Sequence, residues 1–200
     1  MPKSNSKKGY VDVIDGKYKT NGKFHKIEKN EPIFNKDTGK LAGVTNPRDM
    51  TYIHSYGGEA IFFESLGKGK LIASRCENKE CGTSYNSIFM PFRIFCPDCL
   101  HKTSIFDLTD IARKTARIHS FIVTHRSGAF NTLKLPIKFI NVEFEGVCTI
   151  LMSYLSTGNP EIGMRVVPIF KTKNPTYTII DLSFVSEGTP QSKLPEDFSF

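Results

Sequence analysis

The 200-residue sequence lacks the features that identify several large classes of protein. No apolar run approaches the roughly 18 residues that a membrane-spanning helix needs, which argues against a helical membrane protein. The opening residues 1–16 are basic and contain no apolar stretch like that of a secretory signal. We therefore expect a soluble, cytoplasmic protein.

Signature motifs of common enzyme classes are also missing. The sequence contains no GxGxxG, no HExxH and no GxSxG, and the GKGK segment at 67–70 lacks the Walker spacing. Cys148 has no histidine nearby in sequence to activate a thiolate, so we interpret it as core filling in a strand. His119 and His125 share a face of one expected strand but have no acidic residue beside them. These observations predict a chain that does not catalyse by itself.

Positive charge is concentrated at the start of the chain. The formal net charge is +7, and residues 1–50 hold eleven Lys/Arg against six Asp/Glu, whereas residues 51–200 hold sixteen against fourteen. Turn-forming Gly and Asn are frequent in the first segment, so we expect an irregular basic leader there. Such a leader can contact nucleic acid, an acidic protein surface or a phosphorylated ligand, or it can be a solvated tail without contacts.

Four of the five cysteines form two close pairs. The segment CENKECG supplies Cys76 and Cys81, and FCPDC supplies Cys96 and Cys99 after a connection of 14 residues. Zn²⁺ favours tetrahedral thiolate coordination, and two turns that each present two sulfurs can enclose one ion. Because four protein ligands leave no position for water, we predict structural rather than catalytic zinc. Iron in a rubredoxin-like site would use the same ligands.

The remaining sequence predicts a mainly β protein. Residues 51–70 contain a short helix, 71–103 form a zinc ribbon, 104–186 form a barrel, and 187–200 are a polar tail. Short strands at this spacing favour a five-stranded oligomer-binding barrel, the OB-fold. The expected strands are Ile105–Ile111, Thr115–His125, Ile137–Glu145, Val147–Leu155, Met164–Phe170 and Tyr177–Val185.

This order of parts resembles an acyl-CoA-associated family that joins a rubredoxin-like zinc ribbon to an OB-fold barrel. The resemblance covers roughly residues 55–185, and the C-x4-C spacing of the first pair is wider than the family's usual x2. The matching positions precede the ribbon, surround its cysteines or lie in the barrel: Phe62, Phe63, Gly69–Leu71, Cys76, Cys81, Gly82, Pro91, Arg93, Cys96, Pro97, Cys99, Pro136 through Gly146, Ile162, Gly163, Met164 and Val166.

The resemblance implies a non-catalytic scaffold subunit with structural zinc. Members of the family bind thiolases, hydroxymethylglutaryl-CoA (HMG-CoA) synthases or thiolase-like retro-aldolases, and they can help shape a shared coenzyme A channel. The implied partner is therefore a thiolase-like or HMG-CoA synthase-like subunit in a hetero-oligomer. Phe62 and Phe63 are adjacent on a short helix and cannot both face one barrel, so we expect one to pack inside and the other to enter the partner.

A nucleic-acid-binding protein is the alternative, because zinc ribbons and OB-fold barrels both bind single strands. Such a barrel gathers aromatic and basic side chains on one face. The expected strands IKFINVEFEG and GVCTILMSY are mostly aliphatic and poor in charge, and the basic excess lies outside the barrel. The sequence therefore favours a protein interface over a nucleotide groove.

Overall fold

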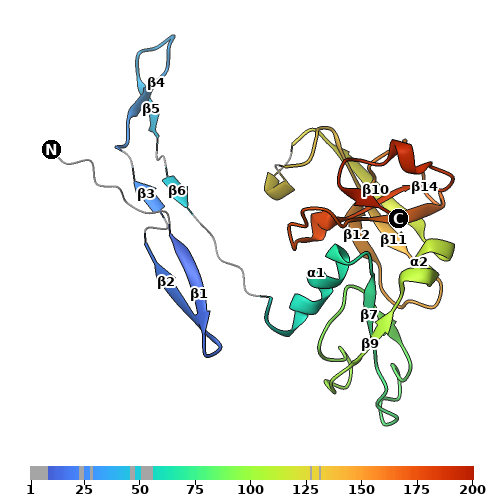
Figure 1. Ribbon diagram of the computed structural model, residues 1–200. Helices are drawn as coiled ribbons and strands as arrows, with labels where there is room; N and C mark the ends of the chain where they lie inside the picture. The colour runs from blue at the N-terminus through green and yellow to red at the C-terminus, as the bar shows by residue number, and fades with distance from the viewer. Residues whose placement is uncertain are drawn as a thin grey trace. The chain divides into compact units, whose positions relative to one another are not determined.

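The computed structural model describes residues 9–22, 25–27, 29–45, 48–50, 56–126, 128–130 and 132–200. The chain divides into two compact units, Met1–Ser55 and Tyr56–Phe200 (Figure 1). Strands predominate over helices in the described residues, as the sequence predicts. No helix in these described ranges is long and apolar enough to cross a membrane.

The first unit contains short hairpins. Asp15 and Gly16, with φ of 52° and 70°, form the two-residue turn of the first hairpin. This corrects the irregular backbone expected for residues 1–50: an Asp-Gly turn between alternating side chains predicts a hairpin, but the polar composition concealed it. The first unit contains three antiparallel strand pairs in its described residues. They are β1 (Tyr10–Ile14) with β2 (Lys17–Asn21), β3 (His25–Ile27) with β6 (Arg48–Met50), and β4 (Pro32–Phe34) with β5 (Leu41–Val44).

The second unit begins with the expected short helix. A 3-10 turn, η1 (Gly57–Glu59), leads into α1 (Ala60–Gly67). Phe62 and Leu66 lie one turn apart on α1 and are both buried, with 2% and 0% of their surface exposed. Gly69 then takes a positive φ of 72°, which lets the chain leave the helix and enter the ribbon.

A three-stranded antiparallel sheet carries the ribbon. β7 (Ile72–Arg75) is its central strand, between β8 (Ile88–Phe89) and β9 (Ser104–Asp107). β7 ends immediately before the first cysteine pair, β8 follows that pair, and β9 follows the second pair. The sheet thus places both cysteine loops at one end of the strands.

The expected strand Ile105–Ile111 is wrong as a barrel strand. Its first half is β9 of the ribbon sheet, and its second half lies in a helix, α2 (Thr109–Thr115). The backbone N–H and the hydroxyl of Thr109 both donate to Oδ1 of Asp107, at 3.0 and 2.6 Å. These bonds satisfy groups at the helix start and end the strand there.

Two sheets form the barrel. In one, β11 (Ile137–Glu143) lies between β10 (Arg117–Thr124) and β12 (Leu151–Tyr154); in the other, β13 (Val166–Lys171) lies between β14 (Leu182–Ser186) and β15 (Phe198–Ser199). Single bridges join the sheets at both sides, Leu155 to Phe184 and Arg117 to Arg165. Without the two-residue strand β15, the order of the other five strands follows that of a five-stranded barrel, although no continuous ladder closes it. Further 3-10 turns are η2 (Gly128–Phe130), η3 (Ile179–Asp181) and η4 (Gln191–Lys193).

β12 begins four residues later than the expected strand Val147–Leu155. The Thr149 hydroxyl accepts a hydrogen bond from the Met90 N–H at 2.6 Å and donates to the Met90 carbonyl at 2.8 Å. The Cys148 N–H donates to the Ile88 carbonyl at 2.8 Å. These residues therefore bind to the ribbon and are unavailable for pairing with β11.

β14 also begins late relative to the expected strand Tyr177–Val185. The buried carboxylate of Asp181 accepts hydrogen bonds from Thr176 and from the Tyr177 N–H, the latter at 2.6 Å. Tyr177 adopts a positive φ of 55° in this loop, a conformation that no strand contains. The local carboxylate thus holds these residues in a loop until Leu182.

One hydrophobic core joins helix, ribbon and barrel. Figure 1 shows α1 beside both β7 and the barrel strands. The ribbon therefore packs on the barrel within one core. Its large, fully buried side chains come from all these parts: Phe62, Leu66, Leu71, Met90, Leu108, Ile118, Ile140, Val142, Phe170, Leu182 and Phe184.

Candidate metal centre

The four paired cysteines meet at the end of the ribbon sheet. The Sγ atoms of Cys76, Cys81, Cys96 and Cys99 all lie within 4.8 Å of one another, and those of Cys76 and Cys99 are 3.7 Å apart. Zn–S bonds of about 2.3 Å in a tetrahedron separate sulfurs by about 3.8 Å. The four side chains therefore fit the coordination of one metal ion.

The first loop accommodates its wide cysteine spacing with an extra turn. The Cys81 N–H donates to the Asn78 carbonyl at 3.0 Å, and the Glu80 N–H donates to Asn78 Oδ1 at 3.1 Å. The loop then closes on Cys76, whose carbonyl accepts the Asn86 N–H at 2.7 Å. The two additional residues are thus absorbed by this turn, and the sulfurs still converge.

The second loop is a tight turn. The Cys96 N–H donates to the His101 carbonyl at 2.9 Å, and the Leu100 N–H donates to the Cys96 carbonyl at 3.1 Å. The His101 ring lies outside the cysteine cluster, with Nδ1 3.0 Å from the side-chain nitrogen of Asn78. His101 therefore connects the two loops and adds no ligand to the cluster.

Burial and hydrogen bonding shift the pKa values of the cysteine thiols in opposite directions. Cys76, Cys81 and Cys96 are buried, and Cys99 is half-buried. Burial raises the pKa of the Cys76 thiol to about 12 and also raises the pKa of Cys81, whereas the Asn78 side chain lowers the pKa of Cys99 to about 6. A divalent cation at the centre would favour all four thiolates, because its charge opposes the desolvation.

Aromatic and basic side chains surround the cluster. Phe89 packs against the buried cysteines, and the guanidinium carbon of Arg93 lies 5.8 Å from the centre of its ring. The guanidinium carbon of Arg75 lies 4.0 Å from the ring centre of Phe106 on β9. Four thiolates on Zn²⁺ would carry a net charge of −2, which these cations partly offset.

The other candidate residues, Cys148, His119 and His125, belong to no further metal-binding cluster among the described residues. Cys148 is exposed in the loop before β12, so its prediction as core filling is wrong. His119 Nδ1 lies 3.0 Å from Glu143 Oε2, an acidic partner on the neighbouring strand that sequence proximity could not reveal. His125 lies beyond the end of β10 and is exposed.

The adjacent phenylalanines occupy different environments. Phe62 lies in the core, whereas Phe63 is half-buried and stacks on Tyr56 with ring centres 4.0 Å apart. The Phe62 and Phe63 rings meet edge to face at 5.3 Å, which restricts both. Phe63 and Tyr177 line a pocket of about 420 Å³ beside α1. Of the two rings, only Phe63 therefore reaches the surface.

No protein-family model matches the chain, and no curated protein matches it. Among solved structures, the chain is similar to a protein with unknown function from the DUF35 family of Sulfolobus solfataricus. The identity is 24% and the TM-score is 0.47, over 67% of this chain and 90% of that one. Similarity at this level of sequence identity and TM-score assigns neither a substrate nor a partner to this chain.

Proposed function

We propose that this chain is a non-catalytic, zinc-binding scaffold subunit of a thiolase-type acyl-CoA enzyme complex. The closed set of four cysteine thiols carries the proposal. An ion held by all four leaves no position for substrate or water, so the metal stabilises the fold and does no chemistry. The resemblance of residues 55–185 to the ribbon-and-barrel family suggests the partner, a thiolase-like or HMG-CoA synthase-like enzyme whose coenzyme A moiety lies near the shared interface.

The pocket beside α1 is the proposed contact with that partner. Its walls are the rings of Tyr56, Phe63 and Tyr177, and its rim carries Glu64 and Lys68, whose charged groups are 3.8 Å apart. An aromatic pocket with a polar rim is typical of interface hot spots. Burying one large apolar side chain there contributes about 1.5–3 kcal/mol, which is sufficient for a principal anchor.

The proposal is tested by affinity purification from an extract of the native cells, with the bound proteins identified by mass spectrometry. We expect a thiolase-like or synthase-like subunit to co-purify with the wild-type chain. Phe63→Ala should weaken its recovery roughly tenfold or more, since tenfold corresponds to about 1.4 kcal/mol. Ile61→Ala is the matched control, because Ile61 is on the same helix, partly exposed and outside the pocket.

Activity measurements complete this test. The purified chain alone should not turn over acyl-CoA substrates, and adding it to the partner should raise the partner's activity. Turnover by the chain alone that Cys148→Ala abolishes would contradict the scaffold role. Recovery of nucleic acid in place of an acyl-CoA enzyme would favour the alternative function.

The barrel supports a protein partner over single-stranded nucleic acid. Phe130 and Phe139 pack edge to face with ring centres 4.9 Å apart, and the Tyr154 hydroxyl donates to the Ile180 carbonyl at 2.9 Å. Rings that are packed against each other or tied to the backbone present less free face for stacked bases.

A further inference from the structure

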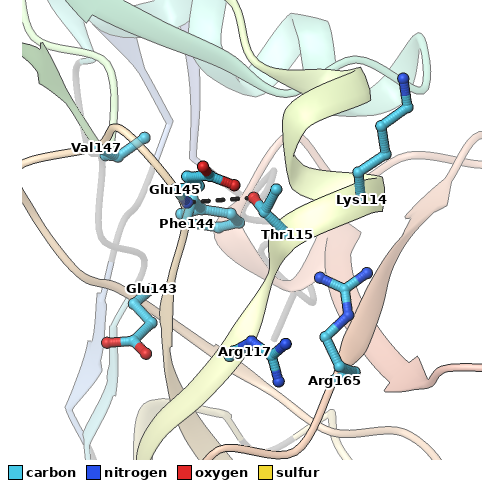
Figure 2. Close-up of a pocket in the computed structure, with 8 residues that line it drawn as sticks. All are labelled: Lys114, Thr115, Arg117, Glu143, Phe144, Glu145, Val147 and Arg165. Atoms are coloured by element: carbon cyan, nitrogen blue, oxygen red, sulfur yellow. Dashed lines mark hydrogen bonds between the residues drawn. The ribbon is translucent and has the colours of Figure 1, made fainter.

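A second pocket lies where the two barrel sheets meet. Its volume is about 520 Å³, and its lining comes from the end of α2, the start of β10, the end of β11 and the residue before β13. Figure 2 shows Lys114 and Arg165 on one side of this pocket and Glu143 on the opposite side. Nothing in the scaffold role requires this arrangement.

Two arginines face each other across the junction of the sheets. Arg117 and Arg165 are partners in an isolated antiparallel bridge. Residues directly opposite in such a bridge project to the same face with Cβ atoms about 4.5–5.5 Å apart, and like charges there are destabilising. Guanidinium groups stay protonated at any physiological pH, so deprotonation cannot relieve the repulsion. The pair therefore favours a nearby anion.

The surrounding residues neutralise this charge only in part. Arg165, whose side chain is 19% exposed, reaches Glu187 Oε1 at 3.2 Å. Arg117 donates from one terminal nitrogen to the Gly163 carbonyl at 3.1 Å, a neutral acceptor. Lys114 makes no ion pair with any described residue. Glu143 lies opposite Arg117 in the ladder of β10 and β11 but pairs with His119, so Arg117 retains free donors at the pocket.

The opposite wall restricts where an anion can bind. Glu143 is paired with His119 at 3.0 Å, and the Glu145 N–H donates to the Thr115 hydroxyl at 3.2 Å. The carboxylates of Glu143 and Glu145 both repel an anion that enters the pocket. An anion in this pocket must therefore lie on the arginine side.

We propose that the pocket binds an oxyanion of the phosphate class between Arg117 and Arg165. The two guanidinium groups supply positive charge and N–H donors for the oxygens of a phosphate. Nη2 of Arg165 already donates to Glu187 and to the Arg113 carbonyl, so its other nitrogens and the remaining donors of Arg117 face the anion. The pocket is larger than one phosphate, so it has room for the remainder of a phosphate ester or diphosphate. This site does not depend on the identity of the scaffold's partner.

Titration of the purified full-length chain with inorganic phosphate and with pyrophosphate tests the proposal, by calorimetry and by amide chemical shifts. We expect saturable binding, with shifts in residues 113–117 and 163–165, that potassium chloride of equal ionic strength does not reproduce. Arg117→Gln should weaken binding at least tenfold. Arg126→Gln is the matched control, since Arg126 is exposed and lies outside the pocket, and it should bind like the wild type.

Unfolding without phosphate provides a second measurement. Arg117→Gln removes a cation that lies opposite both Arg165 and Glu143, so without phosphate its unfolding midpoint should stay near that of the wild type. In phosphate the wild type should gain stability and the variant should not. Wild-type binding that is absent, or that Arg117→Gln and Arg126→Gln weaken equally, would overturn the proposal.

Discussion

Two non-glycine residues in left-handed conformation shape the cysteine loops. Asn86 has φ of 63° and Leu100 has φ of 59°. For a branched side chain such as that of Leu100, this conformation costs on the order of 1–3 kcal/mol. Leu100 is 73% exposed and gains little from packing, so the strain is maintained by the turn itself. Coordination of a metal ion by the four cysteines would supply enough free energy to offset it.

The four candidate ligands were predictable from the sequence, but the turn residues were not. The two cysteine pairs indicate four candidate ligands, because two close pairs of thiols at this spacing are typical of structural zinc sites. Gly82 directly follows Cys81, yet its φ lies outside the left-handed region, whereas those of Asn86 and Leu100 lie within it. The four-residue spacing between Cys76 and Cys81 changes the position of the turn in the first loop. The hydrogen bonds to Asn78 show that position, and the sequence alone does not.

Replacing a buried ligand should remove the metal. Cys96 is fully buried in the cluster, and Cys96→Ser substitutes a poorer ligand there, so we expect less than one metal ion per chain and a loss on the order of 4 kcal/mol in unfolding free energy. Cys148→Ser is the control, because that thiol is exposed and outside the cluster, and its effect should stay within about 0.5 kcal/mol. Elemental analysis and thermal unfolding measure both. Wild-type protein that binds neither zinc nor iron would contradict the assignment.

At the scale of elements, Asp107 links the ribbon to α2. Its Oδ1 accepts from Thr109, whose hydroxyl oxygen also accepts the Leu71 N–H at 2.9 Å. A short apolar segment such as residues 105–111 fits a strand or a helix equally well by its pattern. The carboxylate decides between them, which explains why the expected single strand divides into β9 and α2.

Asp107 should make stability depend on pH. Burial alone would raise its pKa, but hydrogen bonds from Thr109 and the Lys70 ammonium, 3.4 Å away, outweigh burial and hold the pKa below its ordinary value. A lowered folded-state pKa stabilises the fold above the unfolded value near 3.9, and this contribution is lost as pH falls through the folded pKa.

Asp107→Asn should therefore cost about 1 kcal/mol of unfolding free energy at pH 7, and the difference from wild type should shrink below about pH 4. Asp110→Asn is a matched control in the first turn of α2, since the Asp110 side chain is 86% exposed and its carboxylate lies 3.9 Å from Arg113. Urea unfolding across this pH range measures both variants. Equal costs for the two variants, or a cost for Asp107→Asn that persists at low pH, would refute the role of the carboxylate.

At the scale of the whole molecule, the alternation of apolar residues predicted the mainly β class, and together with the helical pattern and the cysteine pairs it predicted the order of helix, ribbon and barrel. It could not predict which contacts compete with a strand. Cys148 and Thr149 alternate correctly for β12 but bind Ile88 and Met90 of the ribbon instead. Such bonds join segments about 60 residues apart, and no local pattern contains them.

The two units should differ in their importance for folding. Every buried residue of the main hydrophobic core lies between Phe62 and Phe184, inside the second unit. Most side chains of β1 and β2 are exposed, so the first unit contributes little apolar burial. Deletion of residues 1–55 should therefore leave the unfolding midpoint within a few degrees of wild type and the metal content unchanged.

The same deletion should weaken assembly with the proposed partner. Residues 1–50 carry eleven Lys/Arg against six Asp/Glu, and such an excess accelerates association with an acidic surface or with the phosphates of coenzyme A. Salt screens charges beyond about 10 Å at 0.1 M, so the deletion should reduce co-purification strongly at low salt and only slightly at high salt. Pull-down of full-length and shortened chains at both salt concentrations measures the difference. Unchanged assembly at both concentrations would mean that the basic segment is a solvated tail.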